Sequence, residues 1–454
     1  MLLSVNPAFS SVIEEYDEYS DEKVNAIIDK ADSAFLAWSE APFTERSRLM
    51  KNASDVLWKR REFLAELMTL EMGKPIIQSR AEIDKCAWVC TYYAANADEF
   101  LKDELVETDA KKSFITCRPL GVILAVMPWN FPFWQVFRFA APGLMAGNTG
   151  LLKHSSNVSG CALAIENVFR DAGFPDGVFS TLLVSSKRVE NIIKDPRIKG
   201  VTLTGSTPAG ISVATASVSV LKKVVLELGG SDPYLILDDA DLESAADTCA
   251  TARLLNGGQS CIAAKRFIVT EKVYDEFLKL FVKKMNSKKM GDPLDPSNDI
   301  GPQAREDLRD ELHSQVRRSV ELGAEVLLGG VIPDIKGAYY PPTILVNVKK
   351  GMPAYHEELF GPVASVIKVR NEDEAIFVAN DTSFGLGAAV FTQDIKKGEE
   401  IAKYKLDAGS CFVNSFVKSD PRLPFGGIKE SGFGRELSLY GIKEFVNIKT
   451  VYIK

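Results

Sequence analysis

Short, almost uninterrupted apolar runs alternate with helix-like stretches through the middle of this 454-residue chain. Strands that are apolar on both faces and separated by helices are typical of a buried parallel sheet with helices on both sides. The pattern therefore predicts an α/β fold. The expected strands are Gly121 to Met127, Thr149 to Leu152, Val178 to Val184, Gly200 to Thr204, Val224 to Leu228 and Tyr234 to Leu237, and the helices between them include Ser159 to Ala172 and Pro208 to Leu221.

A second alternating series follows, and it predicts a second α/β domain whose boundary lies near Gly229-Gly230-Ser231. A chain of this length exceeds one ordinary domain, which agrees with this division. Helices are expected from Leu242, over Val273 to Met285 and from about Gln303, and strands are expected over Phe267 to Thr270 and near Val326, Ala364, Ala388 and Gly409.

The opening third reads as helical, because apolar residues recur at helix spacing from Val24 to Trp38. A second long helix is expected from about Thr44 to Gly73-Lys74-Pro75, where a glycine and a proline end it. The segment Glu104 to Pro119 is polar and extended. With the β-rich tail Phe445 to Ile453, it predicts a protruding hairpin region used in assembly.

Composition excludes several classes of protein. The 54 basic and 61 acidic side chains give a net charge of −7, which disfavours binding to nucleic acid. The chain has no signal-peptide pattern and no apolar run of 18 residues, so we expect no membrane span. Its seven cysteines form no CxxC pair, which favours reduced thiols and a cytoplasmic location. With three histidines and no HExxH motif, we expect no metal site.

Two glycine-bearing segments carry candidate chemistry. The dinucleotide motif GxGxxG is absent, but the turn Thr204 to Gly210 can direct backbone N–H groups at a phosphate; a plain strand-to-helix turn is the alternative. In Asn256-Gly257-Gly258-Gln259-Ser260-Cys261, glycines let the backbone bend tightly around a thiol that is a candidate nucleophile. The alternative is a buried inert cysteine, which is the expectation for Cys86, Cys90, Cys161, Cys249 and Cys411.

Further motifs, taken with the one at Cys261, resemble the aldehyde dehydrogenase superfamily over essentially the whole chain. They are Pro128-Trp129-Asn130-Phe131-Pro132, Glu227-Leu228-Gly229-Gly230, Glu358-Leu359-Phe360-Gly361-Pro362 and the segment Pro424 to Gly432. The segments Leu151 to Val158 and Gly258 to Arg266 are similar to the short bacterial and archaeal succinate-semialdehyde dehydrogenases that use NAD(P).

This resemblance implies a reaction and the residues that perform it. The Cys261 thiolate attacks the aldehyde, while the Asn130 amide and the Cys261 N–H hold the oxyanion. Glu227 then activates the water that hydrolyses the thioester. The implied activity is NAD(P)-dependent oxidation of an aldehyde to its acid, with succinate semialdehyde as the expected substrate. The alternatives are another small aldehyde, such as glyceraldehyde or lactaldehyde, and a non-catalytic binding protein that keeps the fold.

The resemblance also implies where the ligands bind. The cofactor residues are Trp129, Lys153 and Ser156 around the adenosine, His154 and Ser155 through their backbone, Gly205 and Ser206 at the pyrophosphate, and Leu228, Glu358 and Phe360 near the nicotinamide, with Asn130 beside them. The substrate residues are Arg138, Trp134 and Ser419. Many relatives carry an acidic residue at the position of Ser156, so we expect NADP to be preferred and NAD to be a weaker substitute.

Two further positions depart from the family pattern. Phe139 replaces a lysine proposed to relay protons, which leaves Glu436 without its usual partner. Leu255 replaces a second substrate-binding arginine, and an arginine packed at a domain seam is the alternative role for Arg138. The predicted domains are 1–103 with 120–229 for the cofactor, 230–430 for catalysis, and 104–119 with 440–454 for oligomerisation. A homodimer or homotetramer is expected, because the hairpin and the last strand leave edges that another copy would cover.

Overall fold

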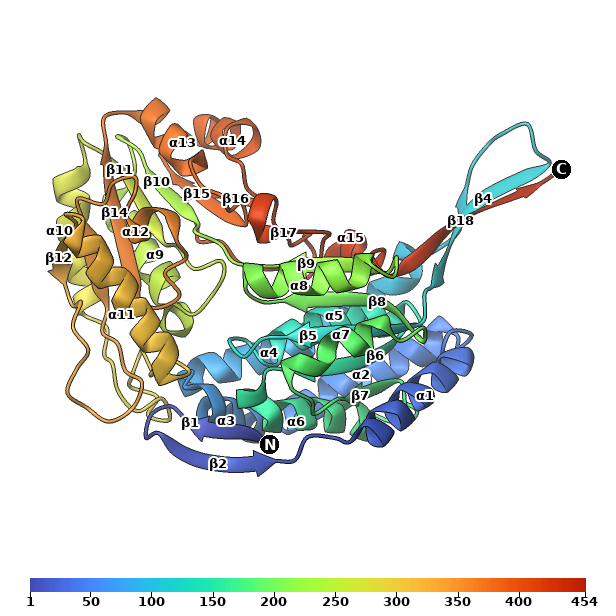
Figure 1. Cartoon of the computed structure of the whole chain (residues 1–454). Coiled ribbons are helices and arrows are strands. Elements are labelled where there is room, and N and C mark those ends of the chain that lie inside the picture. The colour runs from blue at the N-terminus through green and yellow to red at the C-terminus, as the bar shows by residue number, and fades with distance from the viewer.

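The first of two large sheets forms the centre of the molecule (Figure 1). The computed structural model describes residues 1–454. This sheet has six strands in the order β17-β9-β8-β5-β6-β7, all parallel except the edge strand β17. Their bounds are β5 Val122–Met127, β6 Thr149–His154, β7 Phe179–Thr181, β8 Ile198–Thr204, β9 Lys223–Glu227 and β17 Gly432–Phe433.

The second sheet has seven strands in the order β12-β13-β14-β11-β10-β15-β16 and is parallel except for the edge strand β12. The two sheets confirm the predicted α/β class. The predicted boundary at Gly229 to Ser231 falls in the link between β9 and β10. The bounds are β10 Pro233–Ile236, β11 Arg266–Thr270, β12 Glu325–Leu328, β13 Thr343–Val346, β14 Val363–Val369, β15 Gly387–Phe391 and β16 Ser410–Val413.

Buried side chains on both faces explain why these strands are almost entirely apolar. In β5, Val122 and Leu124 belong to one hydrophobic cluster, whereas Ile123 and Ala125 belong to the cluster on the opposite face. Successive side chains of a strand point to opposite faces, so both faces need apolar residues when helices cover them. Helices α2 Phe43–Lys59, α3 Arg61–Met72, α4 Ile76–Phe100, α5 Trp134–Met145 and α6 Ser159–Asp171 cover one face of the first sheet, and α1 Asp21–Trp38, α7 Val189–Lys194 and α8 Thr207–Val218 cover the other.

The second sheet is covered in the same way. One cluster places α9 Leu242–Leu254 and α10 Tyr274–Asn286 against Tyr234, Ile236 and Phe267, and another places α11 Glu306–Glu321, α12 Pro353–His356, α13 Glu372–Asn380 and α14 Ile395–Tyr404 against Leu235 and Ile268. The short helix α15 Ser438–Ile442 precedes the last strand. No helix is long and apolar enough to cross a membrane.

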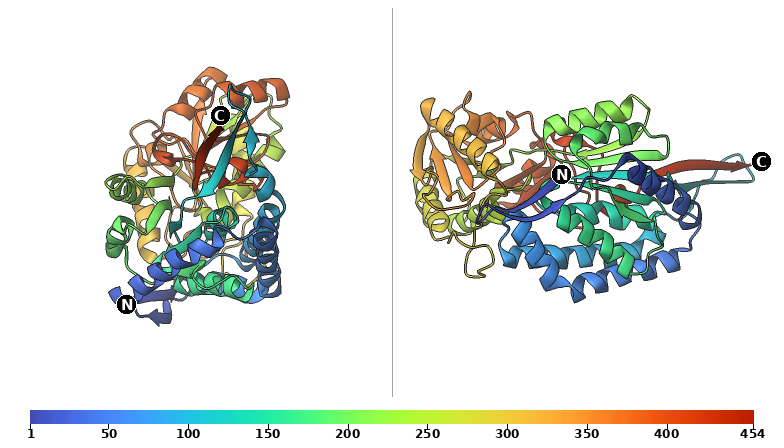
Figure 2. Two further views of the ribbon diagram at one scale, coloured as in Figure 1. Left: turned by 90° about the vertical axis from the view of Figure 1, so that its right-hand side faces the viewer. Right: turned by 60° about the horizontal axis from the view of Figure 1, so that its bottom comes forward.

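A three-stranded arm projects from the molecule, and the C-terminus lies at its tip (Figures 1 and 2). It consists of β3 Glu104–Leu105, β4 Lys112–Pro119 and β18 Val446–Ile453, all antiparallel. The predicted hairpin region and β-rich tail therefore pair with each other, although 326 residues separate the end of β4 from the start of β18 in the numbering.

Three expectations about secondary structure are wrong. The chain opens with a hairpin of β1 Leu2–Asn6 and β2 Ser11–Tyr16 before the first helix. Polar Ser4 and Asn6 occupy buried positions of β1, so the alternation of apolar residues that marks a strand is absent. The expected second helix is broken at Arg60, where neither glycine nor proline signals the break, and β13 was missed.

Glu71 joins the opening hairpin to two helices that cover the first sheet. Its buried carboxylate accepts hydrogen bonds from Ser4 Oγ at 2.8 Å and from the N–H groups of Gly160 at 2.9 Å and Cys161 at 2.8 Å. The last two donors lie in the first turn of α6, where N–H groups have no partner within the helix. One carboxylate on α3 therefore ties β1 and α6 together.

Replacing Glu71 with leucine is expected to lower the midpoint of thermal unfolding by about 4 °C, because two buried N–H groups lose their acceptor at about 1–3 kcal/mol each. Ser4→Ala is the matched control, because it leaves the hydrogen bonds from the Gly160 and Cys161 N–H groups to Glu71 in place. It should lower the midpoint by less than half as much. Calorimetry of the two variants checks this, and equal midpoints would contradict the role of Glu71.

Candidate active site

The loop that carries Cys261 is bent by three successive left-handed residues. After α9, Asn256, Gly257 and Gly258 have φ values of 56°, 60° and 76°. A Cβ atom at Gly258 would lie 2.2 Å from the Gly361 carbonyl oxygen, so only glycine fits there. This bend places Cys261 between the two sheets.

Lys265 holds the loop in place through hydrogen bonds to two of its backbone carbonyl groups. Its buried ammonium donates to the carbonyl oxygens of Ser260 at 2.8 Å and Cys261 at 2.6 Å, and it lies 3.3 Å from a Glu358 carboxylate oxygen. Burial lowers the pKa of Lys265, while Glu358 and Asp232 oppose that shift. The motif around Cys261 includes Lys265, but the pairing of Lys265 with Glu358 joins residues far apart in the chain, so the motif alone gives Lys265 no role.

Asn130 is held with one amide hydrogen free. Its Nδ2 donates to the Gln259 carbonyl at 3.0 Å, and its Oδ1 accepts from Gln135 Nε2 at 3.0 Å. Asn256 Nδ2 donates to the Asn130 carbonyl at 2.7 Å. Gln135, which no sequence motif singles out, therefore fixes the orientation of the Asn130 amide.

A cleft of about 530 Å³ lies between the two sheets at the carboxyl ends of β5, β8 and β9. Ligands bind at this end of parallel strands in open α/β sheets. The rings of Trp129 and Phe360 meet edge to face across 5.7 Å. Of the predicted site residues, the cleft brings together Cys261, Asn130, Trp129, Gly205, Ser206, Leu228, Glu358 and Phe360.

A smaller cavity of about 200 Å³ also reaches Cys261. The three predicted substrate residues Arg138, Trp134 and Ser419 line it, together with Leu255. Cys261 belongs to the walls of both spaces. The thiol therefore lies where the cleft and the smaller cavity meet.

Four predicted cofactor residues line neither space: Lys153, His154, Ser155 and Ser156. They follow one another at the end of β6, where Ser156 is exposed and Lys153 is buried without an ion pair. Burial lowers the pKa of His154 to about 4, so its ring is neutral. Its Nε2 lies 2.9 Å from the Pro132 carbonyl and its Nδ1 accepts from the Ser155 N–H at 3.0 Å, which anchors the segment after Asn130.

Glu227 lies behind the site and lines neither space. Its side chain is buried, and neither carboxylate oxygen has a hydrogen-bond partner. Burial, followed by the nearby Glu436 carboxylate, raises the pKa of Glu227 well above its ordinary value. A buried carboxylate without partners is held in a high-energy environment.

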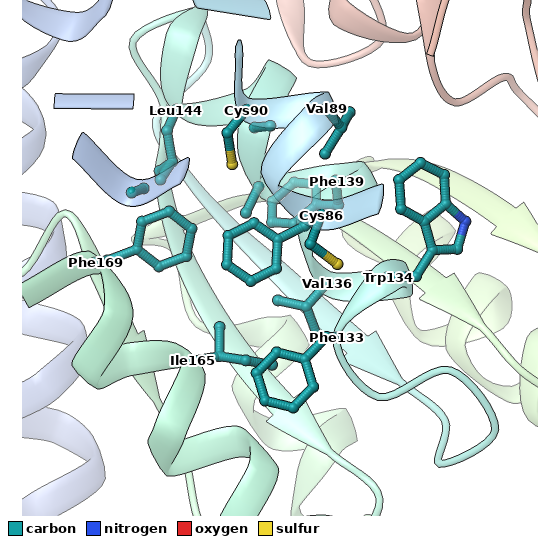
Figure 3. Packing of buried hydrophobic residues seen from close by; sticks show 14 of the residues in the cluster. Cys86, Val89, Cys90, Phe133, Trp134, Val136, Phe139, Leu144, Ile165 and Phe169 are labelled. Carbon is teal, nitrogen blue, oxygen red and sulfur yellow. The ribbon is translucent and has the colours of Figure 1, made fainter. Parts of the chain in front are cut away.

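Glu436, which lacks the family's lysine as a partner, instead forms a buried ion pair with Arg138 through the arginine Nε. Arg138 also donates from Nη2 to Thr204 Oγ1 at 3.2 Å, and its guanidinium lies 4.7 Å from the centre of the Phe425 ring. Phe139, which replaces the family's lysine, is buried in the hydrophobic cluster of the first sheet (Figure 3), and its ring meets that of Phe445 edge to face. Arg138, one residue earlier, supplies the balancing charge instead.

A thiol at the junction of a large cleft and a smaller cavity, between two α/β sheets, is the arrangement of an enzyme that brings a substrate to a cofactor. The chain belongs to the aldehyde dehydrogenase family, because residues 2–451 match the model of that family. A protein from Synechocystis named probable succinate-semialdehyde dehydrogenase [NADP(+)] is 51% identical to this chain, and the match covers all of this chain and 99% of the relative.

Two further relatives agree with this assignment. A Mycobacterium tuberculosis protein named succinate-semialdehyde dehydrogenase [NADP(+)] 1 is 48% identical, with the match covering all of this chain and 99% of the relative. The solved structure of succinic semialdehyde dehydrogenase from Streptococcus pyogenes in complex with NADP+ has a TM-score of 0.98 and 38% identity, and both chains are covered completely.

Alkylation of Cys261 in the protein without cofactor should accelerate steadily with pH. Burial raises the pKa of the thiol to about 12, although Lys265 and Arg138 oppose the shift. Below the pKa, the thiolate fraction rises about tenfold for each pH unit. The rate of iodoacetamide addition at Cys261, followed by mass spectrometry from pH 7 to 9.5, should therefore rise by this factor without a plateau. Cys261→Ser identifies reaction at other thiols. A plateau of the Cys261 rate near pH 8 would contradict a thiol pKa raised by burial.

Proposed function

We propose that the protein oxidises succinate semialdehyde to succinate, with NADP as the preferred cofactor and NAD as a weaker one. The observation that carries the proposal is the position of Cys261, whose thiol borders both a cleft of about 530 Å³ and a smaller cavity with cationic side chains. The names of the relatives from Synechocystis and Mycobacterium tuberculosis support the choice of substrate and cofactor.

The residues around the large cleft fit a dinucleotide. Gly205 and Ser206 precede the 12-residue helix α8, and the Ser206 side chain makes no capping bond with the helix. A helix N-terminus with free donors suits a phosphate. At the end of β6, Lys153 has no carboxylate partner and would pair with a phosphate on the adenosine ribose. NADP, when bound, supplies the acceptor for the hydride that leaves the substrate.

In the first half of the reaction, the Cys261 sulfur adds to the aldehyde carbonyl and forms a thiohemiacetal. Two donors are available for the developing oxyanion. One is the free amide hydrogen of Asn130, and the other is the Cys261 N–H, which makes no hydrogen bond in the structure. Donors that are already in place stabilise this charge without reorganisation. Loss of hydride from the thiohemiacetal leaves a thioester on Cys261.

In the second half, Glu227 takes a proton from the water that attacks the thioester. Its raised pKa makes the Glu227 carboxylate a stronger base toward this water than an ordinary glutamate. Because its carboxyl group lines neither space at Cys261, the side chain must rotate toward the thioester to act. Both oxygens lack hydrogen-bond partners, so this rotation breaks no hydrogen bond.

We further propose a homodimer or homotetramer, the predicted domain division and a cytoplasmic location. The projecting arm supports assembly, because Leu105, Ile448 and Tyr452 expose apolar surface on strands whose edges are open. Sedimentation of the full chain and of a variant with polar residues at Ile448 and Tyr452 would measure the contribution of the arm.

Nicotinamide absorbance with succinate semialdehyde, glyceraldehyde, lactaldehyde and butanal tests the activity. Wild type should reduce NADP fastest with succinate semialdehyde, and Cys261→Ala should abolish turnover. Glu227→Gln should give one rapid turnover followed by an acyl-enzyme visible by mass spectrometry, because only hydrolysis is blocked. Steady-state activity in Cys261→Ala would refute the nucleophile, and absence of turnover with every aldehyde would favour a binding protein.

Ser156→Glu should move cofactor preference toward NAD. A carboxylate beside the adenosine ribose accepts hydrogen bonds from its hydroxyls and repels a 2′-phosphate. The ratio of kcat/KM for NADP to that for NAD should fall at least tenfold, on the order of 1.4 kcal/mol. Ser156→Ala is the control, because it removes the hydroxyl without adding charge. An unchanged ratio in Ser156→Glu would remove this residue from the cofactor site.

A further inference from the structure

Lys85 extends from α4 into the smaller cavity beside Cys261. Its ammonium donates to Ser419 Oγ at 2.8 Å and lies 4.1 Å from the centre of the Trp134 ring. An ammonium has three donors, and the structure assigns an acceptor to only one of them. Lys85 therefore brings unused donors to the wall of this cavity.

The charge of Lys85 is not balanced by a carboxylate. Glu82, one turn earlier on α4, pairs with Lys74 and accepts the N–H groups at the start of α5. Asp420 pairs with Arg422. Lys85 forms no ion pair of its own, so its positive charge is open to an anion in the cavity.

The other cations of the cavity differ from Lys85. Arg138 is balanced by its buried ion pair with Glu436. Lys418 also lines the cavity without an ion pair, but its side chain is exposed, so water screens its charge. Lys85 is thus the partly buried cation of this cavity that has no counterion.

The Ser419 hydroxyl is free to donate a hydrogen bond to the same anion. Its Oγ accepts from Lys85 and, at 3.0 Å, from Trp134 Nε1, while its own hydrogen is given to no acceptor in the structure. With both of these donors directed at the oxygen, the Ser419 O–H is left to donate elsewhere. Lys85 and Ser419 therefore form a pair of neighbouring donors.

We propose that Lys85 binds the distal carboxylate of the aldehyde substrate, together with Ser419 and Arg138, and thereby selects short aldehydes that end in a carboxylate. The inference rests on the proposed function and deepens it. Leu255 stands where relatives carry a second substrate-binding arginine, and Lys85 would supply a cation in its place. Lys85 contacts the far end of the substrate, whereas Cys261 contacts the aldehyde.

The electrostatics of Lys85 agree with this geometry. Burial, followed by the Arg138 charge, lowers the pKa of the ammonium to about 8, while Cys86, Glu82 and Asp420 oppose the shift. The side chain is charged below that pH and neutral above it. A bound carboxylate would favour the charged form, so substrate binding and protonation of Lys85 support each other.

The test compares kcat/KM for succinate semialdehyde with kcat/KM for butanal, which lacks the carboxylate. In Lys85→Met this ratio should fall at least tenfold, mainly through a higher KM for succinate semialdehyde. Lys85→Arg should retain most of the ratio. Lys418→Met is the matched control, because it removes an exposed charge from the same cavity, and its ratio should change less than threefold.

A pH profile of the same ratio separates binding from a structural role, since groups needed for both aldehydes cancel. In wild type the ratio should fall as pH rises through about 8, and in Lys85→Met the inflection should be absent. If wild type prefers succinate semialdehyde but Lys85→Met keeps the ratio, the inference is wrong. If wild type shows no preference for succinate semialdehyde over butanal, the proposed substrate itself fails. Thermal unfolding and NADP binding verify that each variant is folded.

Discussion

A buried ion pair between Lys74 and Glu82 sets the geometry on which the candidate site depends. Lys74 lies in the link between α3 and α4, and its ammonium also lies 3.9 Å from the centre of the Phe131 ring. Glu82 accepts the N–H groups of Phe133 and Trp134, each at 2.9 Å. A carboxylate at a helix N-terminus satisfies free donors and the helix dipole. This one pair therefore holds the first turn of α5 against α4.

Several side chains of the site follow from that arrangement. The segment from Asn130 to Arg138 spans the amide at the wall of the large cleft, the aromatic wall of the smaller cavity and one of the cations of that cavity. Removing one partner of a buried pair leaves an uncompensated charge, which costs about 3–5 kcal/mol in other proteins. The interaction places Asn130 and Arg138 at fixed positions relative to Lys85, because all three depend on the contact between α4 and α5.

The sequence predicted the elements whose buried residues are apolar and regularly spaced. It did not predict the elements whose buried residues are polar and hydrogen-bonded. The parallel strands were recognisable because both of their faces are apolar, as in β5. The opening hairpin was not, because Ser4 is buried through its bond with Glu71. The break at Arg60 involves no glycine or proline, so no residue type marks it in the sequence.

The candidate site shows the same division. Motifs identified the residues of the cleft, including Cys261 and Asn130, since local sequence determines the bends that carry them. Lys85 was missed because its partner Ser419 is 334 positions away, and no local pattern announces such a contact. The ion pair between Arg138 and Glu436 also joins residues far apart in the chain. The family pattern pointed to position 139, where this chain has phenylalanine, and not to the arginine one residue earlier.

The position of Cys261 between two spaces has a kinetic consequence. If the cofactor occupies the large cleft and the aldehyde the smaller cavity, neither ligand has to pass the other to reach the sulfur. Both can then be bound at once, so the arrangement allows a ternary complex of enzyme, cofactor and aldehyde. In this arrangement, the binding of one ligand does not require the other to leave its own space.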